Sequence, residues 1–212
     1  MNNIVSLWPT NVLYEAQAPE ATQEFLSEIL AIGEEYEAAH PEAHVPAAMR
    51  KNKENVYNLL ADPRPVCQLF KQMLKSRMLE LARAEGFLNS VAFEAVTSLR
   101  KFAPGEYAKP HNHRSVDYVA VLWIALEDTD PPNNNTHQHM TGNRFHMIDP
   151  MPSRSRFLNH TMLFPVSPRP GTLLIHPAST FHTTEANLGS VDTIALATNI
   201  KVVDPARNYV TL

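Results

Sequence analysis

The fold of this 212-residue chain is most constrained by short runs of β-branched and aromatic residues in its second half. They are "FEAVTSLRKF" (93–102), "YVAVLWIALE" (118–127), "GTLLIHP" (171–177) and "VDTIALATNIKVV" (191–203). Such runs, bounded by Pro, Gly, Asn or Asp, are typical of β-strands. Because turns and not helical patterns separate them, they predict an antiparallel sandwich or barrel over about residues 91–205. Two further short strands are expected near 144–148 and 161–165.

The first 90 residues or so are predicted to be mostly helical. In residues 20–40 and 65–85, apolar side chains recur at helical spacing among charged ones. Thr22 can cap the first helix, and Gly86 can end the second. With 44% hydrophobic residues the chain can bury a substantial core. Its length favours a single domain over residues 1–212, with the helical part beside the barrel.

The charge distribution, the cysteine content and the hydropathy of the chain limit the partners and the cell compartment that we expect. The chain has 18 basic and 22 acidic residues and no run of one sign, so we expect no nucleic-acid partner. Cys67 is the only cysteine, which excludes an internal disulfide. The chain start does not resemble a signal peptide, and no stretch reaches 18 apolar residues. We therefore expect a cytoplasmic protein without a membrane span. The sequence leaves open whether the protein forms a homo-oligomer.

His111 and His113, in "YAKPHNH", stand directly before an apolar strand. If they end a strand that begins near Tyr107, they point to the same face about 6–7 Å apart. Two imidazoles at that distance can reach one metal ion at about 2.1 Å. His182, in "PGTLLIHPASTFHTTEAN", is the candidate third ligand from a distant strand. Such a facial site with open positions is typical of non-haem Fe(II) oxygenases.

The other histidines have simpler interpretations. His137 and His139 repeat the spacing, but they lie in an asparagine-rich segment that we interpret as a solvated loop. His176 falls in an apolar strand close to His182 in sequence, and it is a candidate partner for a ligand. The proline-broken segment 128–171 is expected to shape a substrate pocket.

The motifs "YAKPHNH", "PGTLLIHPASTFHTTEA" and "TIALATN" together resemble a 2-oxoglutarate/Fe(II) oxygenase family of bacteria and phages, related to the prolyl 4-hydroxylases. The opening "SLWPTNVLY" is also similar to the start of that family. The resemblance covers most of the chain and implies a double-stranded β-helix, that is, a jelly-roll or cupin-like barrel. It implies Fe(II) held by His111, His113 and His182, with 2-oxoglutarate as co-substrate. The implied reaction is hydroxylation of a small or peptidyl substrate at the metal centre.

The chain departs from the family pattern at the residue that binds 2-oxoglutarate. The family places an arginine about ten residues after the last histidine, where this chain has Asp192 or Thr193. An arginine there would pair with the far carboxylate of 2-oxoglutarate. Lys109 is the first candidate to replace it, because it shares strand parity with His111 and His113. Further candidates for contacts to 2-oxoglutarate are Arg100, Lys101, Arg144, Tyr107, Thr193 and Asn199.

A second departure is the third histidine, since prolyl hydroxylases carry HxD where this chain has HxH. Asp117 or Asp149 could then add or replace a metal ligand. The spacing of Gly105, His111 and His113 also fits the first cupin motif, with Asp117 where a glutamate is expected. A cupin-type metal enzyme that does not use 2-oxoglutarate is therefore one alternative. A non-catalytic ligand-binding β-helix protein is the other.

Overall fold

The computed structural model describes residues 4–7, 10–39, 58–86, 92–127, 143–148 and 163–203. Three of the elements are helical: α1 (Gln23–Ala39), the short 3-10 helix η3 (Leu59–Ala61) and α2 (Pro65–Ala84). The strands are β1 (Ile4–Leu7), β2 (Thr10–Glu15), β3 (Ala92–Phe102), β4 (Tyr118–Ala125), β5 (Phe145–Ile148), β6 (Leu163–Val166), β7 (Leu173–Pro177), β8 (Phe181–Thr184) and β9 (Thr193–Val203).

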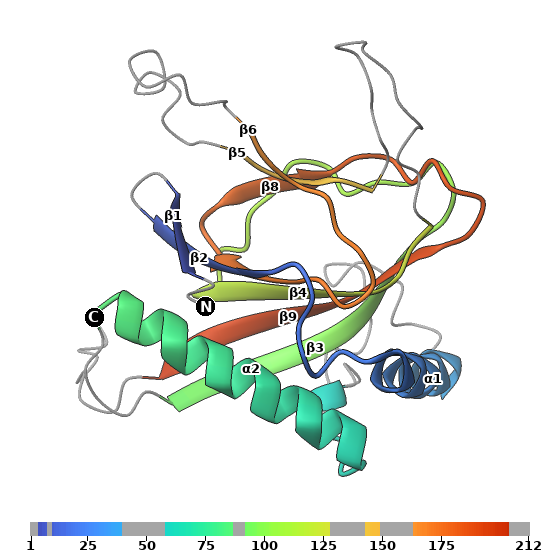
Figure 1. Cartoon of the computed structure of the whole chain (residues 1–212), viewed down its shortest axis with the longest axis horizontal. Coiled ribbons are helices and arrows are strands. Elements are labelled where there is room, and N and C mark those ends of the chain that lie inside the picture. The colour runs from blue at the N-terminus through green and yellow to red at the C-terminus, as the bar shows by residue number, and fades with distance from the viewer. Residues whose placement is uncertain are drawn as a thin grey trace.

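The strands form two antiparallel sheets that face each other (Figure 1). The larger sheet has the order β1-β2-β7-β4-β9-β3, and the smaller has the order β6-β5-β8. Helix α2 runs along the outer face of the larger sheet, with α1 at one end of it (Figure 1). None of the helices in the described ranges combines the length and hydropathy needed to cross a membrane.

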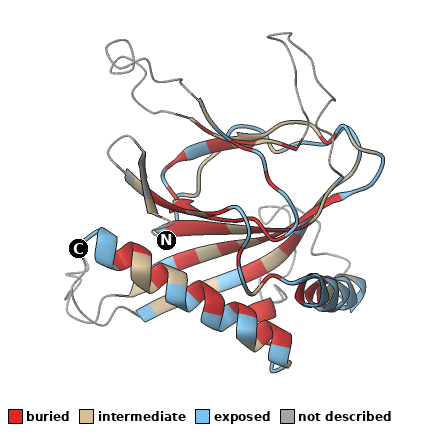
Figure 2. Ribbon diagram, in the orientation of Figure 1, coloured by how far each residue is buried: buried red, intermediate tan, exposed pale blue. Residues whose placement is uncertain are grey.

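The centre of the larger sheet is covered on both faces, which explains the unbroken apolar run of β4. Leu122 of β4 packs in a core with the helices, together with Phe25 of α1 and Phe70 of α2. Trp123, the next residue, points the opposite way into a second core with Phe145 of the smaller sheet. Successive side chains of a strand alternate between its faces, so a strand covered on both sides needs apolar residues at every position. Figure 2 shows the buried residues of α2 on the side that faces the sheet.

The strands predicted in the second half of the chain are confirmed, with ends that differ by one to a few residues. The prediction of a helical N-terminal part is wrong for β1 and β2, which add two strands to the larger sheet. Leu13 of β2 pairs with Ile175 of β7, and Leu13 is fully buried. Pairing with a distant strand fixes this segment, and local sequence patterns carry no signal for such pairing.

Candidate metal centre and pocket

The predicted ligands meet at one backbone bridge. The N–H of His111 donates to the carbonyl of His182 at 3.0 Å, and the N–H of His182 donates back at 2.9 Å. His113 is fixed separately, because its N–H donates to the carbonyl of Ala178 at 2.9 Å. The segment before His111 is therefore a loop with one isolated bridge and not the strand from Tyr107 that the sequence predicted.

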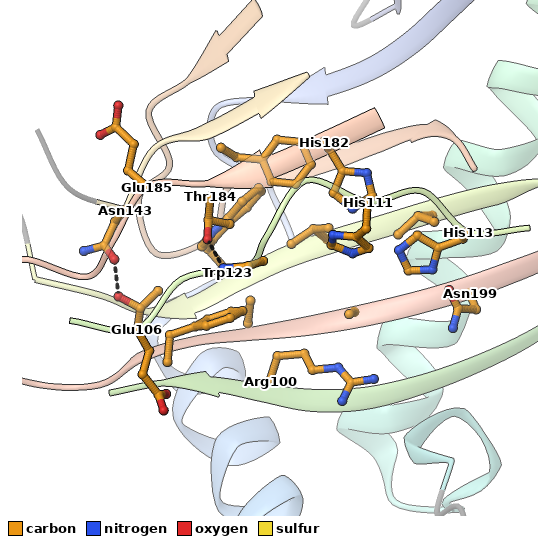
Figure 3. Close-up of a pocket in the computed structure, with 18 residues that line it drawn as sticks. Arg100, Glu106, His111, His113, Trp123, Asn143, His182, Thr184, Glu185 and Asn199 are labelled. Carbon is orange, nitrogen blue, oxygen red and sulfur yellow. Dashed lines mark hydrogen bonds between the residues drawn. The ribbon is translucent and has the colours of Figure 1, made fainter. Parts of the chain in front are cut away.

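The three imidazoles cluster on the inner side of the smaller sheet (Figure 3). One potential ligand atom from each of His111, His113 and His182 lies within 4.8 Å of the others. The ring centroids of His111 and His182 are 4.3 Å apart, and those of His113 and His182 are 5.3 Å apart. Imidazole nitrogen binds a divalent metal ion at about 2.1 Å, so three imidazoles gathered this closely could share one ion.

Two of the rings are oriented by backbone carbonyls. Nδ1 of His111 hydrogen-bonds the carbonyl of Lys109 at 2.7 Å, and Nδ1 of His182 hydrogen-bonds the carbonyl of Thr180 at 3.0 Å. A carbonyl only accepts, so each Nδ1 carries the proton and Nε2 is left with its lone pair. The side chain of His113 lies next to that of Asn199 of β9 (Figure 3). Such contacts are what orient metal-binding histidines, and the donor set fits a divalent transition metal.

Burial favours the neutral form of two of the histidines, which is the form in which imidazole binds a metal ion. Burial and the charge of the neighbouring His176 together lower the pKa of His182 to about 3. Burial also lowers the pKa of His113, with smaller contributions from the charges of His111 and Arg100. The His182 side chain is therefore unprotonated at neutral pH.

The triad lies at one end of a cavity of about 220 Å³ between the two sheets. Apolar side chains such as Val121, Trp123 and Phe145 line its middle. Asn143, Thr184 and Glu185, which the sequence analysis did not single out, also line it. Thr184 could have been found, because it lies two residues after His182 and so shares its face of the strand.

The candidate contacts for 2-oxoglutarate divide into two groups. Arg100, Thr193 and Asn199 line the cavity. The remaining candidates are absent from the lining: Lys109, Tyr107, Lys101 and Arg144. Lys109 was predicted to face the cavity because it would alternate with His111 and His113 on one strand. Its segment is a loop instead, and its side chain is exposed.

The two carboxylates predicted as extra metal ligands do not join the described site. Asp117 is exposed, and its Oδ2 accepts a hydrogen bond from the N–H of Val202 at 2.7 Å. It is not in the ligand cluster, so the prediction of Asp117 as a metal ligand is wrong in this structure. Asp149 lies outside the described residues.

Comparison with known families and structures gives this geometry a context. Residues 99–199, which include all three histidines, match the model of a family described as "Putative 2OG-Fe(II) oxygenase". This part of the chain, just under half of it, is similar to the 2OG-Fe(II) oxygenase family. The match supports an oxygenase, which we favour over the cupin-type and non-catalytic alternatives.

Three solved structures share the fold of this chain. A prolyl-4-hydroxylase from Pseudomonas putida is 12% identical with a TM-score of 0.56, over 92% of this chain and 87% of its own. A non-heme monooxygenase in a nickel complex is 11% identical with a TM-score of 0.55, over 92% and 76%. An alpha ketoglutarate dependent carbocyclase from nogalamycin biosynthesis is 10% identical with a TM-score of 0.56, over 89% and 78%. The predicted double-stranded β-helix is confirmed. No curated protein matches the sequence.

Proposed function

We propose that this oxygenase binds Fe(II) through His111, His113 and His182 and hydroxylates a small or peptidyl substrate with 2-oxoglutarate. The observation that carries the proposal is the cluster of three imidazoles, able to share one metal ion, on the wall of a cavity. When bound, Fe(II) and 2-oxoglutarate supply the oxidation: O2 and the co-substrate convert a C–H bond to C–OH while releasing succinate and CO2.

The protein's own residues orient the reactants and exclude water. The hydrogen bonds of His111 and His182 to backbone carbonyls engage Nδ1 and leave Nε2 of each ring available to bind the ion. Trp123 and Phe145, packed edge to face with centroids 5.8 Å apart, close the cavity with apolar surface. Such surface keeps bulk water from the reacting groups. A cavity of about 220 Å³ suits a small molecule or one side chain of a peptide.

The first test measures metal binding and turnover together. Anaerobically reconstituted protein is expected to bind one Fe(II) per chain and, with O2, to convert 2-oxoglutarate to succinate. His182→Ala should reduce metal content and succinate formation to background, because it removes a ligand nitrogen. His146→Ala is the matched control, since His146 pairs with Glu185 at 2.9 Å and is not in the triad. Full metal content in His182→Ala would overturn the ligand assignment.

A further inference from the structure

The charges that line the cavity are unevenly distributed. Arg100 of β3 is the only lysine or arginine among the described residues of the lining. Its backbone pairs with Ala195 of β9, and Phe102, two residues further along β3, faces the same cavity. In Figure 3 the guanidinium of Arg100 lies at the end of the cavity that holds His113 and Asn199. The cationic side chain is therefore on the metal side.

The opposite end offers neutral and acidic groups. Thr193 stands at the position where the resemblance led us to expect an arginine, and its hydroxyl donates to Oδ1 of Asn143 at 2.6 Å. Nδ2 of Asn143 in turn donates to Asn187 at 3.4 Å. Glu106 and Glu185 line the same end (Figure 3). An anion placed there would meet hydrogen-bonding groups already engaged with one another and two like charges.

We infer that Arg100 binds a carboxylate of 2-oxoglutarate at the His113–Asn199 end of the cavity. This inference rests on the proposed function. A dianion in a largely apolar cavity requires a cationic partner, because an unpaired buried charge is costly. The planar guanidinium can hold a carboxylate with two parallel hydrogen bonds. The chain thus places its carboxylate-binding residue on β3, at the edge of the sheet, and not on the neighbouring β9.

Lys101, the next residue of β3, provides a matched control. Strand alternation directs it to the other face of the sheet, and its Nζ lies 3.2 Å from Glu34 and 3.1 Å from Glu37 of α1. Lys101→Gln therefore removes one positive charge from the same strand without changing the cavity. Any effect of total charge alone should be similar in Arg100→Gln and Lys101→Gln.

The experiment is titration calorimetry on protein loaded with Ni(II), which supports binding without turnover. Arg100→Gln should bind 2-oxoglutarate about 10-fold or more weakly, as expected for a lost hydrogen bond to a charged group. Arg100→Lys should recover part of the affinity, and Lys101→Gln should bind like the wild type. Equal Ni(II) content in all variants shows that the metal centre is intact.

A second ligand, 2-oxobutyrate, identifies which carboxylate Arg100 binds, because it lacks the far carboxylate of 2-oxoglutarate. If Arg100→Gln loses affinity only for 2-oxoglutarate, Arg100 binds the far carboxylate. If it loses affinity equally for both ligands, Arg100 binds the carboxylate next to the metal. Unchanged affinity of Arg100→Gln for both ligands would overturn the inference. If the Ni(II)-loaded wild type does not bind 2-oxoglutarate at all, the proposed co-substrate itself is wrong.

Discussion

His176 is a buried histidine beside the triad that is not one of its ligands. Its ring centroid lies 4.8 Å from that of His182, and its Nδ1 hydrogen-bonds the carbonyl of Pro177 at 2.9 Å. Burial lowers its pKa to about 4, and the charges of His113 and His111 act in the same direction. A neutral imidazole behind His182 therefore adds no positive charge to the centre at neutral pH.

The two buried histidines should make the metal-free protein sensitive to mild acid. In the unfolded chain their pKa is near 6.5, but in the folded protein it is about 4 for His176 and about 3 for His182. As the pH falls below about 6.5 only the unfolded chain gains these protons, so stability is lost from there downward. Between pH 6.5 and 5 the free energy of unfolding should fall by about 1.5 kcal/mol for each histidine.

Urea unfolding of the metal-free protein at several pH values measures this loss. His176→Gln removes one of the two titrating groups, so the dependence of its unfolding free energy on pH should be shallower. An unchanged dependence in that variant would mean that His176 is already protonated in the folded protein or stays neutral in both states.

A site residue could be predicted from the sequence only where the signal for it lies in neighbouring residues of the chain. The candidate triad followed from the short spacing of His111 and His113 and from the strand before His182. Arg100 was only a weaker candidate because a cation on a predicted strand can face either side. Asn143 has a left-handed φ of 59° and accepts a hydrogen bond from Thr193, which is 50 residues away in the sequence. Nothing in the local sequence indicates such a contact.

At the scale of elements, periodicity predicted the long helices and most strands but not β1, β2 and β8. β8 has four residues, of which Phe181 is exposed. It is a strand because Met147 of β5 pairs with His182 on one side and His111 bridges to it on the other. Short strands held by distant partners carry too few residues for a periodic signal.

Helix α2 is attached to β2 by a largely buried ion pair. Nε of Arg77 lies 3.1 Å from Oε1 of Glu15, whose side chain is 5% exposed, and a terminal nitrogen of Arg77 lies 2.8 Å from Glu20. Arg77→Met should lower the free energy of unfolding by about 3 kcal/mol, because it removes the cation that pairs with the buried carboxylate of Glu15.

Urea unfolding of a double mutant separates the charge from the packing. Adding Glu15→Gln to Arg77→Met removes the isolated charge and should restore a large part of the lost stability. If the two substitutions are instead additive, the attachment of α2 to β2 is mainly apolar packing.

At the scale of the whole molecule, the metal centre should contribute to stability. The proposed ligands come from the loop before β4 and from β8, so an ion bound there would cross-link segments about 70 residues apart. At a metal concentration 100 times Kd, binding to the folded state alone adds about 2.7 kcal/mol. Ni(II) should therefore raise the melting temperature of the wild type and of His146→Ala by about 5–10 °C.

Thermal unfolding of His182→Ala is the decisive comparison. Its melting temperature should not change with Ni(II), because one of the three ligands is missing. A similar rise in that variant would place the stabilising metal elsewhere on the protein.

The cytoplasmic location, the absence of a nucleic-acid partner and a homo-oligomeric state stay predictions from the sequence.

The position of β9 in the larger sheet has a consequence for how the chain is made. β9 lies between β4 and β3, although it is the last strand in the described part of the chain. During synthesis β3 and β4 therefore leave the ribosome long before the strand that joins them, and neither can complete its pairing until then. Since β9 also carries Ala195 and Asn199 of the cavity wall, the pocket forms only after translation has passed its last residues.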